Sequence, residues 1–183
     1  MASLVILNFP SNLFSAQILN KDSNQNKMRI GFNLFIKEAE KSKNKVLQKR
    51  TNELGLQKEA YKGFDLHLRN AGMSFKDIEI LTNAMHKADA DGILSIKSFS
   101  LSYNPGISDK GVRMLVKVFP PQLTELGLVE CNLGDNAGKA IYQLVQYSNN
   151  LQLICIEGNL FSSGMKHKFK ALSKQKKNIL LII

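Results

Sequence analysis

The string LTELGLVECNL at residues 123–133 decides the fold that the sequence predicts, because variants of it occur three more times between residues 63 and 161. The shared pattern is Leu-x-x-Leu-x-Leu-x-x-Asn/Cys/Ala-x-Leu, and apolar residues at helical spacing follow it. The copies are GFDLHLRNAGM (63–73), IKSFSLSYNPGI (96–107), LTELGLVECNL (123–133) and LQLICIEGNLF (151–161). Periods of 33, 27 and 28 residues separate their Asn/Cys/Ala positions, which are Ala71, Asn104, Cys131 and Asn159. Recurrence at this spacing predicts a repeat protein.

Each copy predicts a strand, a turn and a helix. In a strand, Leu126 and Leu128 point to one side, which we expect to be the core. Cys131 then lies in a turn, where a small polar or soft side chain can bond to backbone groups that would otherwise be buried and unpaired. Residues 110–119 and 138–147 carry apolar groups at helical spacing, so each turn leads into a helix.

Such units are stable only when they stack, because one unit cannot bury its apolar side alone. Helices are wider than the strand spacing of about 4.8 Å, so the stack must curve with its parallel sheet inside. Residues 61–183 thus resemble a ribonuclease-inhibitor-type leucine-rich repeat protein, and residues 104–111 and 131–138 match that family's turn into the helix. The resemblance implies an α/β fold: a short leucine-rich repeat solenoid with its curved parallel sheet on the concave face and its helices on the convex face.

The two ends of the repeat region depart from the pattern. The first copy has Gly63 in place of the leading Leu, and a longer connection at residues 86–92 follows it. At the other end, Ile179 and Ile182 are in register for a fifth strand. We therefore expect about four repeats plus a terminal strand, whose edge either continues beyond residue 183 or is covered by another surface.

Residues 1–60 are expected to form a section of their own, packed on or continuous with the repeats of residues 61–183. Residues 4–15 also fit the repeat pattern and predict a first strand. The polar run at 20–27 predicts a loop. Residues 36–61 predict a helix that is interrupted near Gly55.

Composition favours one compact intracellular protein. The chain has 183 residues, 44% of them hydrophobic, which suffices for a sizeable core. Two cysteines give no disulfide framework, and no Lys or Arg precedes Lys21, which argues against a signal peptide. No stretch approaches the roughly 20 apolar residues of a membrane span. We expect a cytoplasmic location; the Lys- and Asn-rich sequence also resembles leucine-rich repeat effectors that intracellular bacterial pathogens secrete into the host cytosol.

The net charge of +10 raises the question of a polyanionic partner. Of the 25 basic residues only four are Arg, which is the side chain preferred for reading bases, and no aromatic pattern accompanies the Lys. The Lys residues concentrate at 37–62 and 166–177, on predicted helices. We interpret them as a solvated convex face, with weak binding to nucleic acid or an anionic membrane as an alternative.

Catalytic and metal-binding patterns are weak. Cys155 and His67 fall on predicted strands separated by two others, beyond the reach of about 3 Å that a thiol and its base require. Residues 87–98 lack the first and last ligands of a calcium loop, and residues 138–140 lack the rest of a phosphate loop. The sequence therefore predicts no enzyme activity, no cofactor and no metal site.

The concave face is the predicted functional surface. Ser and Gly give it a shallow floor, while Glu125, Glu130 and Glu157 form an acidic stripe on a basic protein, which suits a partner with a basic rim. The predicted partner-binding residues are Asp65, His67, Arg69, Ser98, Ser100, Ser102, Tyr103, Glu125, Val129, Glu130, Leu153, Cys155 and Glu157.

We therefore expect a non-enzymatic module that binds another protein. The resemblance to the ribonuclease inhibitor type implies that this face grips an enzyme and blocks its active site. The partner of such a module is an enzyme, a host protein or another effector. The remaining alternatives are the substrate receptor of a ubiquitin-ligase-type assembly and a basic peripheral binder of nucleic acid or membranes.

Overall fold

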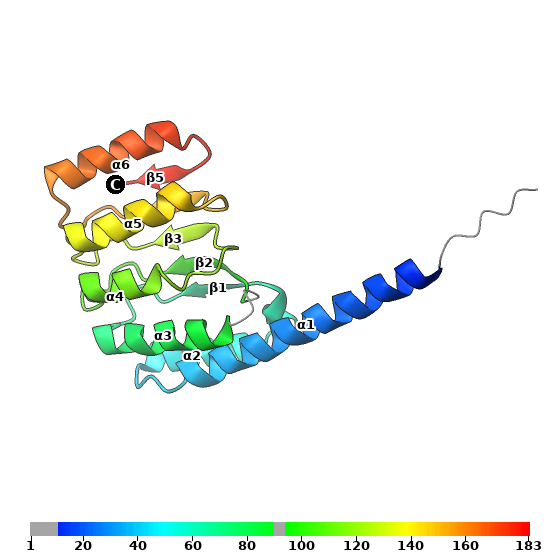
Figure 1. The fold of residues 1–183 in the computed structure, drawn as a ribbon. Helices are drawn as coiled ribbons and strands as arrows, with labels where there is room; N and C mark the ends of the chain where they lie inside the picture. The colour runs from blue at the N-terminus through cyan, green and yellow to red at the C-terminus, as the bar shows by residue number, and fades with distance from the viewer. Residues whose placement is uncertain (1–10, 90–93) are drawn as a thin grey trace, which may run out of the picture.

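The computed structural model describes residues 11–89 and 94–183, with side chains described from residue 22 onward (Figure 1). Of the first strand predicted at residues 4–15, residues 4–10 lie outside this part of the chain. Of the connection predicted at residues 86–92, residues 90–92 lie outside it, and residues 86–88 are helical. The elements are α1 (Ser11–Ala39), α2 (Lys45–Leu56), the 3-10 helix η1 (Ala60–Lys62), β1 (Phe64–His67), α3 (Phe75–Ala88), β2 (Ile96–Ser100), α4 (Ser108–Leu115), β3 (Glu125–Gly127), α5 (Asp135–Tyr147), β4 (Leu153–Cys155), α6 (Ser163–Gln175) and β5 (Leu180–Ile182).

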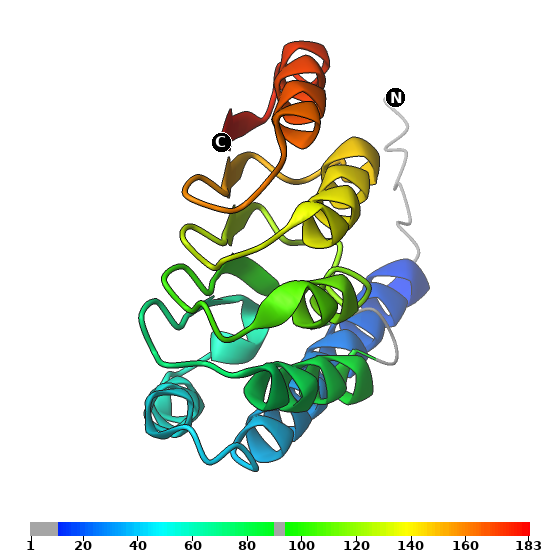
Figure 2. The ribbon, with the colours of Figure 1, turned by 90° about the vertical axis from the view of Figure 1, so that its left-hand side faces the viewer.

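The strands form one parallel five-stranded sheet in the order β1-β2-β3-β4-β5, which is also their order in the chain. A helix follows each of the first four strands and carries the chain back to the start of the next one. Helices α3 to α6 lie side by side along one face of the sheet (Figure 2). The fold is therefore α/β, and the predicted strand–turn–helix order of residues 63–175 is confirmed, as is the predicted fifth strand.

One row of side chains fills the space between the sheet and the helices. Leu66, Phe99, Leu126 and Ile154 are paired in register across β1 to β4, and each is at most 1% exposed. Leu128, two residues after Leu126, is also 1% exposed. The leucines of residues 123–133 therefore point into the core, as their alternation predicts.

The turn after each strand is held by a buried side chain at the Asn/Cys position. Asn104 accepts hydrogen bonds from the backbone N–H groups of Ala71 and Met73, at 3.0 and 2.9 Å. Its amide nitrogen donates to the carbonyl oxygens of Leu68 and Leu101, both at 2.7 Å. A single side chain thus satisfies backbone groups of its own turn and of the preceding turn.

The same arrangement recurs two units later. Asn159 accepts from Cys131 and Leu133 and donates to the carbonyls of Leu128 and Ile156. Between these two units, the thiol of Cys131 lies 3.2 Å from the carbonyl oxygen of Leu101. The predicted role of this position, which is to satisfy buried backbone groups in the turn, is confirmed.

The N-terminal section differs from the prediction. Residues 20–27, predicted as a loop, belong to α1, as do residues 12–15, which we expected to turn after a strand. Residues 20–27 contain no Pro or Gly that would end a helix, so their polarity indicated solvent exposure and not a helix break. The helix predicted over residues 36–61 is interrupted at residues 40–44, between α1 and α2. Helix α2 then ends at Leu56, one residue after the break predicted near Gly55.

Helix α1 packs its C-terminal half on the first repeat unit, while its N-terminal half extends away from the stack (Figure 1). The rings of Phe32 and Phe35 contact the ring of Phe64, with centroids 5.2 and 5.5 Å apart. At Gly31 the helix approaches α3 so closely that a Cβ atom would lie 2.7 Å from the carbonyl oxygen of Ala88. Any side chain at this position would push the two helices apart.

The turn between α1 and α2 is bonded to the first repeat unit. Asn44 caps α2 by accepting from the N–H groups of Val46 and Leu47, and it donates to the carbonyl oxygen of Ala71 at 2.8 Å. Ser42 donates to the carboxylate of Asp77 in the first turn of α3, at 2.6 Å. The N-terminal section is therefore packed on the repeats through both helices and the turn between them.

An ion pair between α1 and α3 gives a pH-dependent contribution to this packing. Hydrogen bonds from Lys41 and Lys87 lower the pKa of Glu38 from 4.5 to about 2. The unfolded chain therefore binds this proton more readily, so the stabilisation is complete above pH 4.5 and is lost as the pH falls through about 2. We expect Glu38→Gln to lower stability at neutral pH and to flatten its dependence on pH over this window.

Urea unfolding of the wild type and Glu38→Gln between neutral pH and pH 2 measures the effect. Glu40→Gln, which removes an exposed carboxylate of the same helix end, is the matched control. An equal loss of pH dependence in both variants would contradict the assignment to Glu38.

Candidate functional site on the open sheet face

The face of the sheet opposite α3 to α6, here called the open face, carries the predicted partner-binding residues. In-register pairing places Asp65, Ser98, Glu125, Leu153 and Leu180 in one row across the strands. A second row consists of His67, Ser100, Gly127, Cys155 and Ile182. In the described part of the chain no helix covers this face (Figure 2). The prediction is confirmed for the position of the strand residues on this face, namely Asp65, His67, Ser98, Ser100, Glu125, Leu153 and Cys155. Their role in binding a partner stays a prediction.

A hollow of about 410 Å³ lies at the middle of the open face, and we call it the central hollow. All of the predicted partner-binding residues except Asp65 and Glu130 line it. Its depth depends on Gly127, where a Cβ atom would lie 2.8 Å from the hydroxyl oxygen of Ser100 and 3.1 Å from that of Ser102. The absence of a side chain at Gly127 thus leaves space over the centre of the sheet.

A chain of hydrogen bonds crosses three strands beside the central hollow. The hydroxyl of Ser98 donates to Oε2 of Glu125 at 2.8 Å, and its oxygen lies 2.7 Å from Nε2 of His67. Since the hydroxyl proton is directed at the carboxylate, the imidazole nitrogen donates to the serine. A nucleophilic serine needs the opposite order, with the imidazole accepting its proton, so this chain orients side chains and does not activate Ser98.

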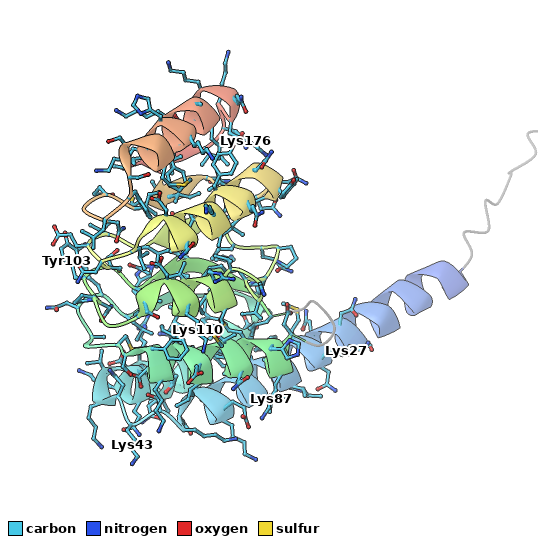
Figure 3. The ribbon with its side chains drawn as sticks, turned by 60° about the vertical axis from the view of Figure 1, so that its left-hand side comes forward. Lys27, Lys43, Lys87, Tyr103, Lys110 and Lys176 are labelled. Atoms are coloured by element: carbon cyan, nitrogen blue, oxygen red, sulfur yellow. The ribbon has the colours of Figure 1, made fainter. Side chains whose placement is uncertain are left out.

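Tyr103 is positioned by a contact that the sequence did not indicate. The guanidinium of Arg69 lies over its ring, 4.2 Å from the centroid, so one face of the ring is already occupied. The residue has a positive φ of 64° in the turn after β2, and Figure 3 shows it at the edge of the stack. Glu130, in the equivalent turn after β3, lines a neighbouring hollow together with Tyr103 and lies outside the central hollow.

The carboxylates of the open face have few partners. Neither Glu125 nor Glu157 forms an ion pair with any described residue. One oxygen of Glu157, Oε2, is buried and has no hydrogen-bond donor among the described residues. Because a buried charged oxygen without a donor is costly, a positive charge placed near the carboxylate of Glu157 would stabilise it.

Cys155 lies on the floor of the central hollow as a half-buried free thiol. Burial raises its pKa, and the negative charges of Glu157 and Glu125 raise it further. The thiol is therefore less ionised than an ordinary cysteine, which is the reverse of an activated nucleophile. His67 is on β1, with β2 and β3 between it and Cys155, as the sequence predicts.

The effect of Glu157 on this thiol is testable. Of the two carboxylates that raise the pKa of Cys155, Glu157 has the larger effect, and replacing it with Gln removes its charge. We therefore expect Cys155 to be alkylated severalfold faster by iodoacetamide at neutral pH. Mass spectrometry of the peptide that contains Cys155 measures the rate. Glu130→Gln, which neutralises a carboxylate outside the central hollow, should leave the rate unchanged; equal acceleration in both variants would show that Glu157 has no specific effect.

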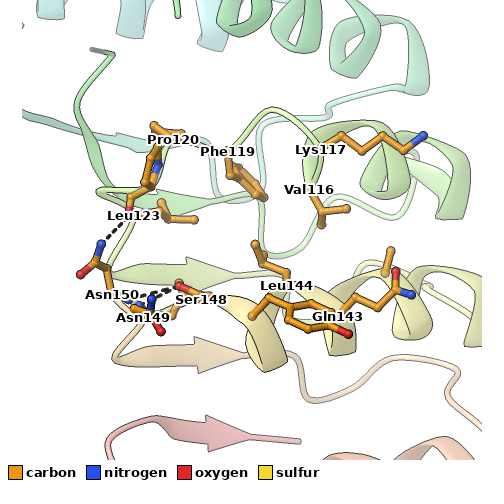
Figure 4. Close-up of a pocket in the computed structure, with 14 residues that line it drawn as sticks. Val116, Lys117, Phe119, Pro120, Leu123, Gln143, Leu144, Ser148, Asn149 and Asn150 are labelled. Carbon is orange, nitrogen blue, oxygen red and sulfur yellow. Dashed lines mark hydrogen bonds between the residues drawn. The ribbon is translucent and has the colours of Figure 1, made fainter. Parts of the chain in front are cut away.

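A second hollow, of about 460 Å³, lies beside the C-terminal ends of α4 and α5 (Figure 4). Val116, Phe119 and Leu144 contribute apolar atoms to it, and a hydrogen bond of 2.7 Å from Asn150 to the carbonyl of Pro121 closes one side. No sequence pattern indicated this hollow, because it forms between loops of successive units. No group of metal-ligating side chains occurs in the described residues.

Comparison with known proteins adds no assignment. No protein-family model matches the sequence, and no curated protein is significantly similar to it. In the described part of the chain no helix has the length and apolar character needed to cross a membrane.

Proposed function

We propose that this chain is a short leucine-rich repeat protein of the ribonuclease-inhibitor type that binds another protein through its open face. The observation that carries the proposal is that the predicted partner-binding residues converge on the central hollow, where Glu125 and Glu157 have no ion-pair partner among the described residues. The buried asparagines at positions 104 and 159 support the repeat assignment, since each bonds its own turn and the preceding one.

The dimensions of the open face suit a protein partner. Five strands about 4.8 Å apart give a floor roughly 20 Å wide, which with the adjoining turns can contribute to the roughly 800 Å² that each partner buries in an ordinary stable interface. The small side chains of Ser100 and Ser102 and the absence of a side chain at Gly127 keep the middle of this floor open. A partner with a protruding element would fit such a floor better than a partner with a flat surface would.

Charge gives the open face a preference among partners. Asp65, Glu125, Glu130 and Glu157 are acidic and Arg69 is the basic residue among the predicted set, whereas the whole protein has a net charge of +10. Lys87 and Lys110 lie on helices α3 and α4, Lys43 lies in the turn before α2, and Lys176 directly follows α6 (Figure 3). A partner that is basic where it meets this face would be attracted to it and repelled by the remaining surface, which fixes the orientation of binding.

Comparative affinity capture tests the proposal. The tagged wild type, Leu153→Arg and Lys170→Glu are used on the same lysate, and captured proteins are compared by mass spectrometry. Leu153 lines the central hollow, whereas Lys170 is exposed on α6. We expect Leu153→Arg to lose the specific partner and Lys170→Glu to retain it, with melting curves confirming that both variants are folded.

Direct titration of the purified partner then gives the size of the effect. Leu153→Arg should weaken binding by more than about 1 kcal/mol, which is roughly fivefold, and Lys170→Glu should change it little. If Lys170→Glu abolishes binding and Leu153→Arg does not, the Lys-rich helices are the functional surface and the proposal fails. A partner that proves to be nucleic acid or anionic lipid, with affinity that collapses as salt rises, would also overturn it.

A further inference from the structure

We propose that the central hollow is a pocket for one arginine side chain of the partner. This inference rests on the proposed function and adds the chemistry of the contact at its centre. The hollow combines carboxylates without ion-pair partners among the described residues, open space over Gly127 and apolar side chains.

Two glutamates line the hollow at different heights along the strands. Glu125 is in register with Leu153, at the start of the paired segment, while Glu157 follows Cys155 beyond the end of β4. Both charges act on the thiol of Cys155, which lies between them on the floor. A cation placed above Cys155 would therefore interact with both carboxylates at once.

Neither carboxylate has its charge compensated by a cation among the described residues. The hydroxyl of Ser98 donates to Oε2 of Glu125, and no hydrogen bond to Oε1 is formed by the described residues. Oε2 of Glu157 is buried without a donor among the described residues, so the charge of this carboxylate is poorly solvated. A carboxylate that has already lost part of its hydration gains more from an incoming cation than a fully solvated one, because the cost of removing water has been met on folding.

The shape of the hollow suits a long side chain with a polar end. Its volume of about 410 Å³ lies within the range of about 300–1,000 Å³ that is typical of small-ligand pockets. Val129 and Leu153 line it and can contact an aliphatic stem, as arginine stems do on apolar surfaces. The hydroxyls of Ser100 and Ser102 border the space over Gly127 and add acceptors.

The spread of acceptors favours arginine over lysine. A guanidinium presents five N–H donors in a planar fork and can contact separated carboxylates and hydroxyls together, whereas an ammonium is a compact point charge. Arg69 also lines the hollow, but its guanidinium is stacked on Tyr103, toward β1 and β2. Glu125 is on β3 and Glu157 follows the end of β4, so the two positive groups would occupy different parts of the face.

Nuclear magnetic resonance titration of the isotope-labelled full chain tests the pocket without a known partner. The probes are the peptides acetyl-Ala-Ala-Xaa-Ala-Ala-amide, in which Xaa is arginine, citrulline or lysine. Citrulline has the shape of arginine without its charge. We expect the arginine peptide to cause saturable shifts at the amides of residues 125–129 and 153–157, with affinity at least tenfold higher than that of the citrulline peptide and measurably higher than that of the lysine peptide.

Protein variants locate the site. Glu157→Gln should weaken binding of the arginine peptide at least tenfold, and Glu130→Gln, the matched change outside the central hollow, should leave it unchanged. The inference is overturned by the absence of saturable shifts, by equal affinity for the arginine and citrulline peptides, or by equal effects of the two variants. Equal affinity for the lysine peptide would overturn the choice of arginine.

The proposed function and the arginine pocket can fail separately. If the captured partner is lost with Leu153→Arg but binds Glu157→Gln as tightly as the wild type, the open face is the binding surface and the arginine pocket is wrong. If Glu157→Gln and Leu153→Arg both leave the partner's affinity unchanged, the proposed function fails as well.

Discussion

Replacing Leu128 with aspartate is expected to unfold most of the protein under native conditions. Leu128 is 1% exposed and lies between the sheet and the helices, with no described cation among the core residues around it. The change loses about 1.5–3 kcal/mol of apolar burial and adds several kcal/mol for an unpaired buried charge. The sum, about 5 kcal/mol or more, is comparable with the whole stability of an ordinary domain, which is about 5–15 kcal/mol.

Urea unfolding followed by circular dichroism measures this effect, with Gln152→Asp as the control. Gln152 is exposed just before β4, so the same new charge should cost little there. Similar unfolding midpoints for Leu128→Asp and the wild type would show that residues 123–133 do not face the core.

Asn104→Ala is expected to cost about 3–5 kcal/mol. The side chain makes four hydrogen bonds of 3.0 Å or less to backbone groups that are buried in two successive turns. Each unsatisfied group costs about 1–3 kcal/mol, and neighbouring losses are not additive because the two turns can relax together. The residue is 0% exposed, so water cannot replace the lost amide without opening the turn.

The control for Asn104→Ala is Asn83→Ala, at an exposed position on α3. Alanine is the better helix former, so this change should leave stability unchanged or slightly raised. Chemical denaturation of both variants gives the comparison. Equal midpoints would contradict the structural role assigned to the buried asparagine.

The strand–turn–helix units were predictable because period and burial agree in them. Leu126 and Leu128 alternate with outward residues, and Asn104 and Asn159 recur at the turns, so local sequence determines the strand, the turn and the exposed face. The terminal strand was predictable for the same reason, because Ile179 and Ile182 continue the pattern. The open-face residues follow from this register alone.

The N-terminal section was not predictable to the same degree. The residues from Asn20 to Lys27 are polar without helix breakers, a pattern shared by loops and exposed helices, and they lie in α1. The cap at Asn44 follows a recognisable preference for Asn before a helix, and it could have located the start of α2. The packing of Phe32 on Phe64 joins segments that the sequence does not relate by any period.

The details of the candidate site depend on side-chain geometry that sequence does not encode locally. His67 and Ser98 are 31 residues apart and Ser98 and Glu125 are 27 apart, and they form a hydrogen-bonded chain only because three strands are in register. The stacking of Arg69 on Tyr103 and the unbonded oxygen of Glu157 likewise depend on neighbouring turns. The face was predictable, whereas the hollow and its unpaired charges were not.

Protection of Cys155 in the complex tests the central claim, that the open face binds the partner. The thiol lies on the floor of the central hollow and is half-buried, while the other cysteine, Cys131, is fully buried in a turn. Alkylation of Cys155 with iodoacetamide, followed by mass spectrometry with and without the captured partner, therefore reports on this face. The variant Lys170→Cys provides a second thiol on the exposed surface of α6 as an internal reference. We expect the partner to slow alkylation at position 155 in proportion to the bound fraction and to leave position 170 unaffected; protection at position 170 with full reactivity at position 155 would contradict the account.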